Sequence, residues 1–166
     1  IGAVNSINWA RLMAQVVYYF AAALQLGAPD RKIAFSVPTG NFGDVFAGHV
    51  AARMGLPVER LVVATNVNDI LHRALSDGDY SAGDVTPTAA PSMDIQVSSN
   101  FERLLFDVGG RDGVAMAEQM RGFEGSRAML LTQAQRAGAD LFTSARADAD
   151  DMARSMRWAC EEAGEV

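Results

Sequence analysis

The sequence has 166 residues, of which 49% are hydrophobic and 20% charged, and these values describe an ordinary globular protein of one domain. Its formal net charge of -6 argues against a nucleic-acid partner, which usually needs a basic patch, and no run of Lys and Arg indicates a membrane surface. The single cysteine, Cys160, excludes an intramolecular disulfide and a cysteine-rich metal site, and a cytoplasmic setting is expected.

Residues 5–26 predict a buried helix, with Asn5 or Ser6 as its N-cap. From residue 12 to residue 26 the sequence is apolar nearly all round, but it is too short for a membrane span. Three aromatic residues in this segment are expected to lie in the core: Tyr18, Tyr19 and Phe20.

The next stretch predicts a strand, a glycine-bearing turn and a helix. Residues 32–37 form an apolar run that is typical of a buried strand, and residues 44–54 have the pattern of a helix. Between them, Gly40 and Gly43 allow the backbone to come close to a ligand. This order aims backbone N–H groups and the positive end of a helix dipole at one point, where a phosphate or carboxylate can bind. The local pattern leaves a plain tight turn equally open, because neither a dinucleotide fingerprint nor a P-loop is present.

A second strand is predicted at residues 59–65 and a short helix at residues 68–75, with an Asn or Asp cap. Strand–helix–strand spacing of this size implies a parallel sheet, in which ligands bind beyond the carboxyl ends of the strands. The glycine turn lies at such an end. Residues 76–91 are expected to form a surface loop, with a mobile lid as the alternative.

The C-terminal half predicts mainly helices. A brief extended segment is expected within residues 92–100, followed by a helix through Phe106 that Ser98, Ser99 or Asn100 caps, with Glu102 placed for a capping box. The remaining elements are helices at 115–121 and 127–137 on either side of Gly122 to Gly125, a strand at 141–144, and a charged helix at 147–163 with Met152, Met156 and Trp158 on its inner face.

Other candidate residues for chemistry are interpreted as structural. His49 and His72 lack metal-ligand spacing, and Cys160 lacks a partner histidine. The acidic residues 148–151 begin the last helix, where they complement its dipole. No metal site is therefore expected.

Three long strings of the sequence carry a family resemblance. They are Gly2-Ala-Val-Asn-Ser-Ile-Asn-Trp-Ala-Arg11, Val37-Pro-Thr-Gly-Asn-Phe-Gly-Asp44 and Pro91-Ser-Met-Asp-Ile-Gln-Val-Ser-Ser-Asn-Phe-Glu-Arg-Leu-Leu105. In this order they resemble the threonine synthase family, and a shorter string between them, Thr65-Asn-Val-Asn-Asp-Ile-Leu71, also fits.

The resemblance implies an α/β fold of the PLP fold type II (tryptophan-synthase-β-like) class, a three-layer parallel-sheet domain with a helix-rich C-terminal part. It also implies the cofactor pyridoxal 5′-phosphate and the conversion of O-phospho-L-homoserine and water into L-threonine and phosphate. The residues that it places around the cofactor phosphate are Gly40, Asn41, Phe42, Gly43 and Asp44. Those that it places near the small-molecule substrate are Asn5, Ser6, Asn8 and Arg11.

The sequence departs from the family in its lysines. The single lysine, Lys32, matches no motif of the cofactor-bearing lysine, which in the family lies upstream of every matched string. The chain begins with Ile1, so residues 1–166 are expected to be one α/β domain of a longer enzyme, without its lysine-bearing N-terminal part and extreme C-terminal part. No catalytic residue is therefore assigned, and the chain alone is expected to be inactive.

Two other interpretations remain open. The first is another fold type II PLP-dependent lyase, which the long matching strings disfavour. The second is a non-catalytic module that binds a phosphate ligand, and the missing lysine favours it. The oligomeric state is also left open.

Overall fold

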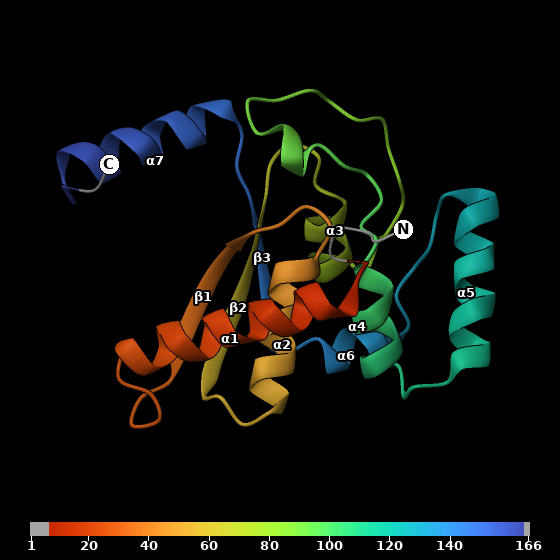
Figure 1. The fold of residues 1–166 in the computed structure, drawn as a ribbon. Coiled ribbons are helices and arrows are strands. Elements are labelled where there is room, and N and C mark those ends of the chain that lie inside the picture. Colours follow the sequence, from red (N-terminus) through yellow and green to blue (C-terminus); the bar gives the residue numbers. More distant parts are fainter. Residues whose placement is uncertain (1–6, 165–166) are drawn as a thin grey trace.

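The computed structural model describes residues 7–164 and contains a three-stranded sheet with helices packed around it (Figure 1). The strands are β1 (Ile33–Pro38), β2 (Val58–Thr65) and β3 (Phe142–Arg146), in the order β1-β2-β3. Both strand pairs are parallel, so the carboxyl ends of all three strands meet at one edge. The parallel sheet predicted from the sequence is confirmed.

Three helices belong to the N-terminal half: α1 (Trp9–Gln25), α2 (Gly43–Arg53) and α3 (Ile70–Ser76). Helix α1 packs along α2, and α3 packs against β2 and β3. The cap of α1 is Asn8, whose side chain accepts a 3.0 Å hydrogen bond from the N–H of Ala10, so the predicted cap at Asn5 or Ser6 is wrong.

The prediction that α1 is buried all round is also wrong. One stripe at helical spacing faces α2 and the sheet, and it consists of Leu12, Val16, Tyr19 and Ala23. Apolar residues on the other side are exposed, including Tyr18, which was expected in the core. No helix within residues 7–164 is long and apolar enough to cross a membrane.

The C-terminal half contains a short 3-10 helix, η1 (Pro91–Met93), where an extended segment was expected. Four helices and β3 follow it. Helix α5 runs without a break through Gly122 and Gly125, which were expected to separate two helices. The helices are α4 (Phe101–Val108), α5 (Gly113–Ser126), α6 (Gln133–Gly138) and α7 (Ala149–Glu161).

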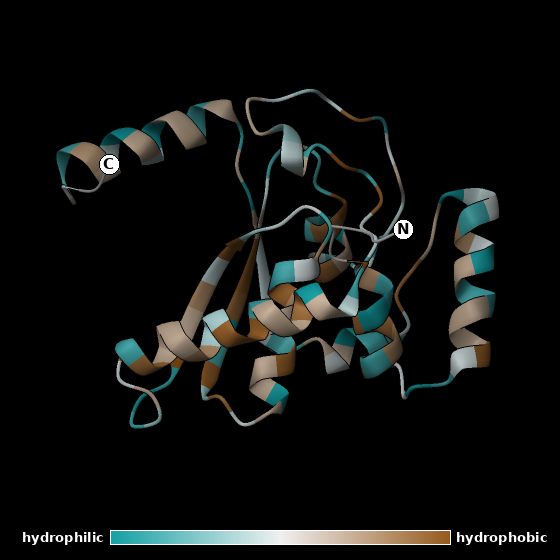
Figure 2. Cartoon of the chain, in the orientation of Figure 1, coloured by the Kyte–Doolittle hydropathy of each residue, from teal (hydrophilic) through white to brown (hydrophobic). Residues whose placement is uncertain are grey.

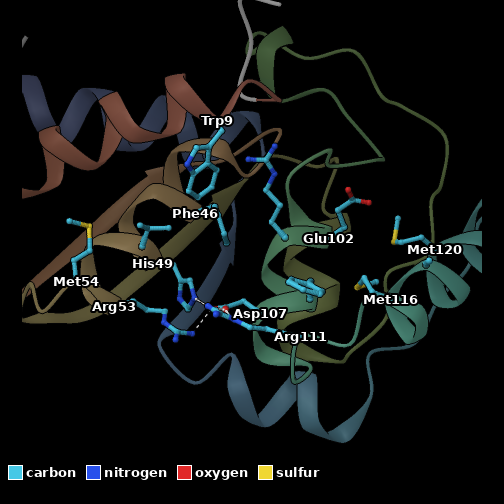
Figure 3. A pocket seen from close by; sticks show the side chains of 15 residues that line it. Trp9, Phe46, His49, Arg53, Met54, Glu102, Asp107, Arg111, Met116 and Met120 are labelled. Carbon is cyan, nitrogen blue, oxygen red and sulfur yellow. Dashed lines mark hydrogen bonds and ion pairs between the residues drawn. The ribbon is translucent and has the colours of Figure 1, made fainter.

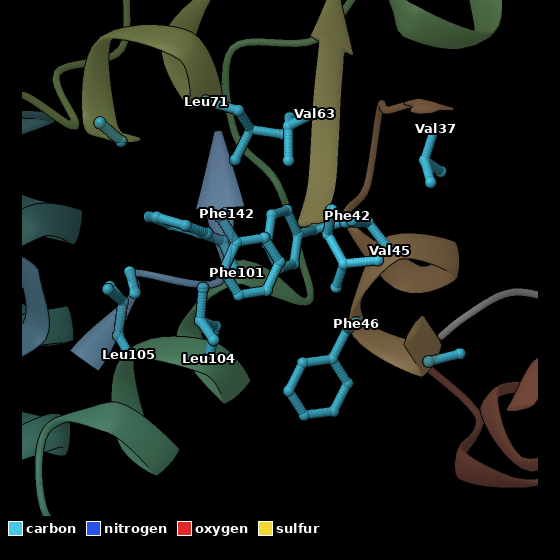
Figure 4. Close-up of a cluster of buried hydrophobic side chains, with 14 of the residues drawn as sticks. Val37, Phe42, Val45, Phe46, Val63, Leu71, Phe101, Leu104, Leu105 and Phe142 are labelled. Atoms are coloured by element: carbon cyan, nitrogen blue, oxygen red, sulfur yellow. The ribbon is translucent and has the colours of Figure 1, made fainter. Parts of the chain in front are cut away.

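The core lies between the sheet and helices α1, α2, α3 and α4, and the hydropathy colouring shows the apolar strands enclosed there (Figure 2). Three aromatic rings form its centre, those of Phe42, Phe101 and Phe142 (Figure 4). Helix α7 extends away from this core and buries no residue. Its Trp158 is 62% exposed and Met156 is exposed too, so the prediction of an inner face is wrong for this part of the chain.

Candidate functional site

The glycine turn, residues 39–43, leads from the carboxyl end of β1 into α2. Phe42 occupies the last position before the helix with a φ of 62°, in the left-handed region that favours glycine. Its side chain is only 1% exposed, and its ring lies 5.1 Å from that of Phe101 and 5.6 Å from that of Phe142, measured between centroids. A left-handed non-glycine residue costs about 1–2 kcal/mol, so this packing is what holds the unusual backbone in place.

Gly40 is required by a close backbone contact. A Cβ atom at this position would lie 2.6 Å from the carbonyl oxygen of Ser92, a distance that real Cβ atoms do not reach. The segment around η1 therefore presses directly on the turn. Substitution by any other residue must displace one backbone from the other.

The first turn of α2 carries no side-chain cap. Because Phe42 stands at the N-cap position, no side chain there accepts a hydrogen bond from the first N–H groups of the helix. The first N–H groups of an α-helix have no acceptor inside the helix. Together with the helix dipole, they make the start of α2 suited to an anion.

A cavity of about 230 Å³ opens at this helix start. The backbone and side chains of residues 38–45 line one side of it, and α1 contributes Arg11 and Gln15 to the other. The structure thus brings Arg11, one of the residues predicted to contact the substrate, to the predicted cofactor residues Gly40 to Asp44.

Gln15 was not singled out from the sequence. It lies one helical turn after Arg11, and its buried Oε1 has no hydrogen-bond partner among the described residues. The i, i+4 spacing from Arg11 was the available signal. Of the other predicted substrate residues, Asn8 caps α1, whereas Asn5 and Ser6 lie outside the described residues.

Asp44 is the acidic group of this cavity. Partial burial raises the pKa of its carboxyl group, while a hydrogen bond from the Tyr19 hydroxyl lowers it, and the net shift is upward. Burial, and next the charge of Asp44, raise the pKa of Tyr19, so this hydroxyl stays protonated and donates. Asp44 is consequently easier to protonate than an exposed aspartate.

A larger cavity of about 810 Å³ lies elsewhere, among α2, α4, α5 and Trp9 of α1 (Figure 3). Much of its wall is apolar, and four of its polar side chains are joined through one carboxylate, that of Asp107. Asp107 has Arg53 Nη1 at 2.6 Å, Arg111 Nε at 2.7 Å and His49 Nε2 at 2.9 Å. Burial alone raises the pKa of Asp107, but the bonds from His49 and Arg111 and the charge of Arg53 outweigh it and lower the pKa. A charged ligand would have to compete with these contacts for Arg53, Arg111 and Asp107.

The remaining candidates have structural partners, as the sequence suggested. His72 Nδ1 lies 2.9 Å from Ser144 Oγ, and Asp148 forms a capping box with Asp151 at the start of α7. Within residues 7–164, no three His, Cys, Asp or Glu side chains are grouped to hold a metal ion.

Comparison with known proteins gives a consistent result. No protein-family model matches the chain. It is 58% identical over 164 residues to the threonine synthase of Pseudomonas aeruginosa, covering 99% of this chain and 34% of that protein. It is 60% identical over 116 residues to the threonine synthase of Corynebacterium glutamicum, covering 68% of this chain and 24% of that protein.

Solved structures agree. A PLP-bound threonine synthase from Brucella melitensis matches with a TM-score of 0.96 and 51% identity, over 99% of this chain and 36% of that one. The yeast threonine synthase matches with a TM-score of 0.88 and 40% identity, over 95% of this chain and 33% of that one. The chain therefore spans about a third of the relatives that it matches. The resemblance stated from the sequence and the α/β fold that it implies are both confirmed.

Proposed function

We propose, from the homology of this chain to threonine synthases over nearly its whole length, that the protein containing it converts O-phospho-L-homoserine and water into L-threonine and phosphate, with pyridoxal 5′-phosphate as cofactor. Residues 1–166 then correspond to one α/β domain of that enzyme, which has its cofactor-bearing lysine outside this chain. The composition supports a cytoplasmic location, which stays a prediction.

The observation that carries this proposal is the uncapped start of α2 at the cavity beside Gly40 and Gly43. A phosphate group fits this site chemically, because it accepts hydrogen bonds from N–H groups and carries the charge that the helix dipole attracts. The cavity of about 230 Å³ at this helix start gives the group room, and Gly40 and Gly43 both line it. We therefore propose that Gly40, Asn41, Phe42, Gly43 and Asp44 surround the cofactor phosphate.

When bound, PLP supplies an electron sink, which the protein must orient and keep from side reactions. In the proposed site, the glycine turn fixes the phosphate end, and the rigid packing of Phe42 prevents the turn from relaxing. Arg11, across the cavity from the start of α2, adds a positive charge to that of the helix dipole. Arg11 is the best supported of the proposed substrate residues, and Asn5, Ser6 and Asn8 remain proposals based on the resemblance.

Activity of the full-length protein tests the proposal. Purified with PLP, it is expected to release phosphate from O-phospho-L-homoserine and to form threonine in equal amount. The isolated 166-residue chain is expected to release none, because its only lysine, Lys32, lies directly before β1, away from the glycine turn that follows the other end of that strand. Absence of threonine formation by the full-length protein contradicts the proposal.

Two alternatives are separated by the same assay. Another PLP-dependent lyase of this fold would release phosphate from O-phospho-L-homoserine slowly or not at all, and it would act on a different amino acid. A non-catalytic module would bind pyridoxine 5′-phosphate without turnover of any amino acid. The high identity to several threonine synthases favours the first proposal over both.

A further inference from the structure

We infer that Ser98 and Asn100 are positioning residues for the proposed phosphate site, because they hold the carbonyl groups of the glycine turn away from the cavity. The inference rests on the proposed function and adds two residues to it. Neither was predicted to act on the turn, since both were interpreted only as possible caps of α4. Asn100 stands at that N-cap position, but its side chain makes no capping hydrogen bond.

Their contacts reach the turn from a distant part of the chain. The hydroxyl of Ser98 donates to the carbonyl oxygen of Gly40 at 3.0 Å. The side-chain amide of Asn100 donates to the carbonyl oxygen of Asn41 at 2.9 Å, and its backbone N–H donates to the same oxygen at 3.2 Å. Two successive carbonyl groups of the turn are thus bound from one side.

A third carbonyl group is fixed by the helix itself. The oxygen of Phe42 accepts from the N–H of Phe46 at 3.0 Å, as the first hydrogen bond of α2. The carbonyl groups of Gly40, Asn41 and Phe42 therefore all have donors. The three residues themselves line the 230 Å³ cavity.

Because the peptide unit is planar, a hydrogen bond that fixes a carbonyl group also fixes the direction of the N–H group that follows it. In a trans peptide unit, the C=O and the following N–H lie in one plane and point in opposite directions. Binding the oxygen of Gly40 therefore turns the N–H of Asn41 away from Ser98, and binding the oxygen of Asn41 turns the N–H of Phe42 away from Asn100. We call Ser98 and Asn100 the clamp. With the N–H of Gly43, the N–H groups of Asn41 and Phe42 make three successive donors on the side opposite to the clamp. Such a group of N–H donors is an anion-binding nest.

The segment that carries the clamp is itself held firmly. The hydroxyl of Tyr80 accepts from the N–H of Ser98 at 2.8 Å. Four residues before Ser98, the carboxylate of Asp94 accepts from the side chains of Asn66 at 2.6 Å and Asn68 at 3.0 Å. Both asparagines follow the carboxyl end of β2. Asn100 is 0% exposed. These contacts give Ser98 and Asn100 the fixed positions that an orienting role requires.

The test compares two neighbouring serines in the full-length enzyme freed of its cofactor. Ser98→Ala removes the donor to Gly40, whereas Ser99→Ala makes the same chemical change at an exposed residue whose hydroxyl accepts weakly from the side-chain amide of Asn100, at 3.4 Å, and has no hydrogen bond to residues 39–43. The probes are pyridoxine 5′-phosphate and pyridoxine, which differ only by the phosphate group. Their dissociation constants are measured by fluorescence titration, together with the free energy of unfolding of each variant.

We expect Ser98→Ala to lower the preference for the phosphorylated probe about threefold to tenfold, the range of one neutral hydrogen bond, and Ser99→Ala to leave it unchanged. Asn100→Ala, which keeps the backbone donor to Asn41, is expected to lower it by a similar factor. A merely structural role would weaken both probes equally and leave their ratio unchanged.

Two outcomes overturn the inference, and they differ in what else they affect. If the unmodified enzyme prefers the phosphorylated probe and Ser98→Ala has the same preference as Ser99→Ala, the clamp is wrong and the phosphate site stands. If the unmodified enzyme binds both probes equally, the phosphate site and the clamp are both wrong.

Discussion

The two cavities of this protein differ in what their polar groups already bind. In the larger one, Asp107 binds His49, Arg53 and Arg111, and much of the remaining wall is apolar. In the smaller one, the N–H groups at the start of α2 have no side-chain cap, and the nearby carboxyl group of Asp44 is bound by a neutral hydroxyl. The smaller cavity is therefore the one prepared for an anion.

The comparison shows that volume is a poor guide to chemistry in this fold. The larger cavity has more than three times the volume of the smaller one, about 810 against 230 Å³. Its Asp107, however, joins α4 to His49 and Arg53 of α2. A charged ligand there would have to break ion pairs before it could form its own. The smaller cavity offers donors whose orientation has already been fixed by the protein.

The largest effect is expected from filling the space at the glycine turn. In Gly40→Ala, the new methyl group meets the carbonyl oxygen of Ser92 at 2.6 Å, and the turn must move. A displacement of this kind costs about 100-fold in binding or rate, so we expect PLP to bind about 100-fold more weakly. PLP titration of the full-length protein measures it.

The matched control is Gly122→Ala, which adds the same methyl group within α5, where no atom lies within 4 Å. It is expected to keep full PLP affinity and to stabilise the protein by up to about 1 kcal/mol. Equal PLP affinity for the two variants would show that the turn does not hold the cofactor.

The second-largest effect is expected on the free energy of unfolding, from a substitution in the larger cavity. Asp107→Asn weakens the contacts to His49, Arg53 and Arg111, but the two arginine side chains are 53% and 60% exposed, so solvent screens much of the loss. We expect the free energy of unfolding to fall by about 1–2 kcal/mol at pH 7, with PLP affinity unchanged. Urea denaturation measures the change, and Glu102→Gln on the same helix is the control.

The pH dependence of this loss has a definite sign. The pKa of Asp107 is lower in the folded state than the ordinary value of 3.8, so the folded protein favours the carboxylate. Its contribution is complete well above pH 3.8 and is lost as the pH falls through the lowered pKa. The difference between the unmodified protein and Asp107→Asn should therefore shrink below pH 4, roughly, and a difference that grows on acidification would contradict this interpretation.

The sequence predicted the glycine turn and the two elements that flank it better than the contacts that distant segments make with them. Strand, glycine turn and helix are local patterns, so β1, the turn and α2 could be located from residue types alone. The clamp could not, because Ser98 and Gly40 are 58 positions apart and their contact depends on how the segment before α4 folds back. For Gln15 the i, i+4 spacing from Arg11 was a signal, but its place in the cavity wall depends on how α1 packs on α2.

The wrong predictions have physical causes as well. Gly122 and Gly125 suggested a helix break, but each costs only about 1 kcal/mol within a helix, and the residues around them suffice to continue it. On α7, Met152 and Met156 have the i, i+4 spacing of one face, which Trp158, two residues after Met156, does not share, and the helix buries no residue. Spacing predicts which residues share a face, but it does not say what covers that face.

The smallest effect is expected from Asp44, whose contribution to stability is opposite in sign to that of Asp107. Because partial burial raises the pKa of Asp44 despite the bond from Tyr19, its folded state favours the protonated form, which is the opposite of Asp107. Asp44→Asn should therefore stabilise the protein at pH 7, and this gain should vanish as the pH falls below 3.8, where the carboxyl group is protonated in both states.

The gain is small for two reasons. Asp44 is partly exposed, so solvent screens its charge, and its carboxylate also interacts favourably with the start of α2, which the substitution removes. We expect a net gain of about 0.5 kcal/mol in urea denaturation at pH 7. A loss at pH 7 that disappears on acidification would place Asp44 in the same class as Asp107. The start of α2 would then be neutralised by its own carboxylate, and the contrast between the two cavities would fail.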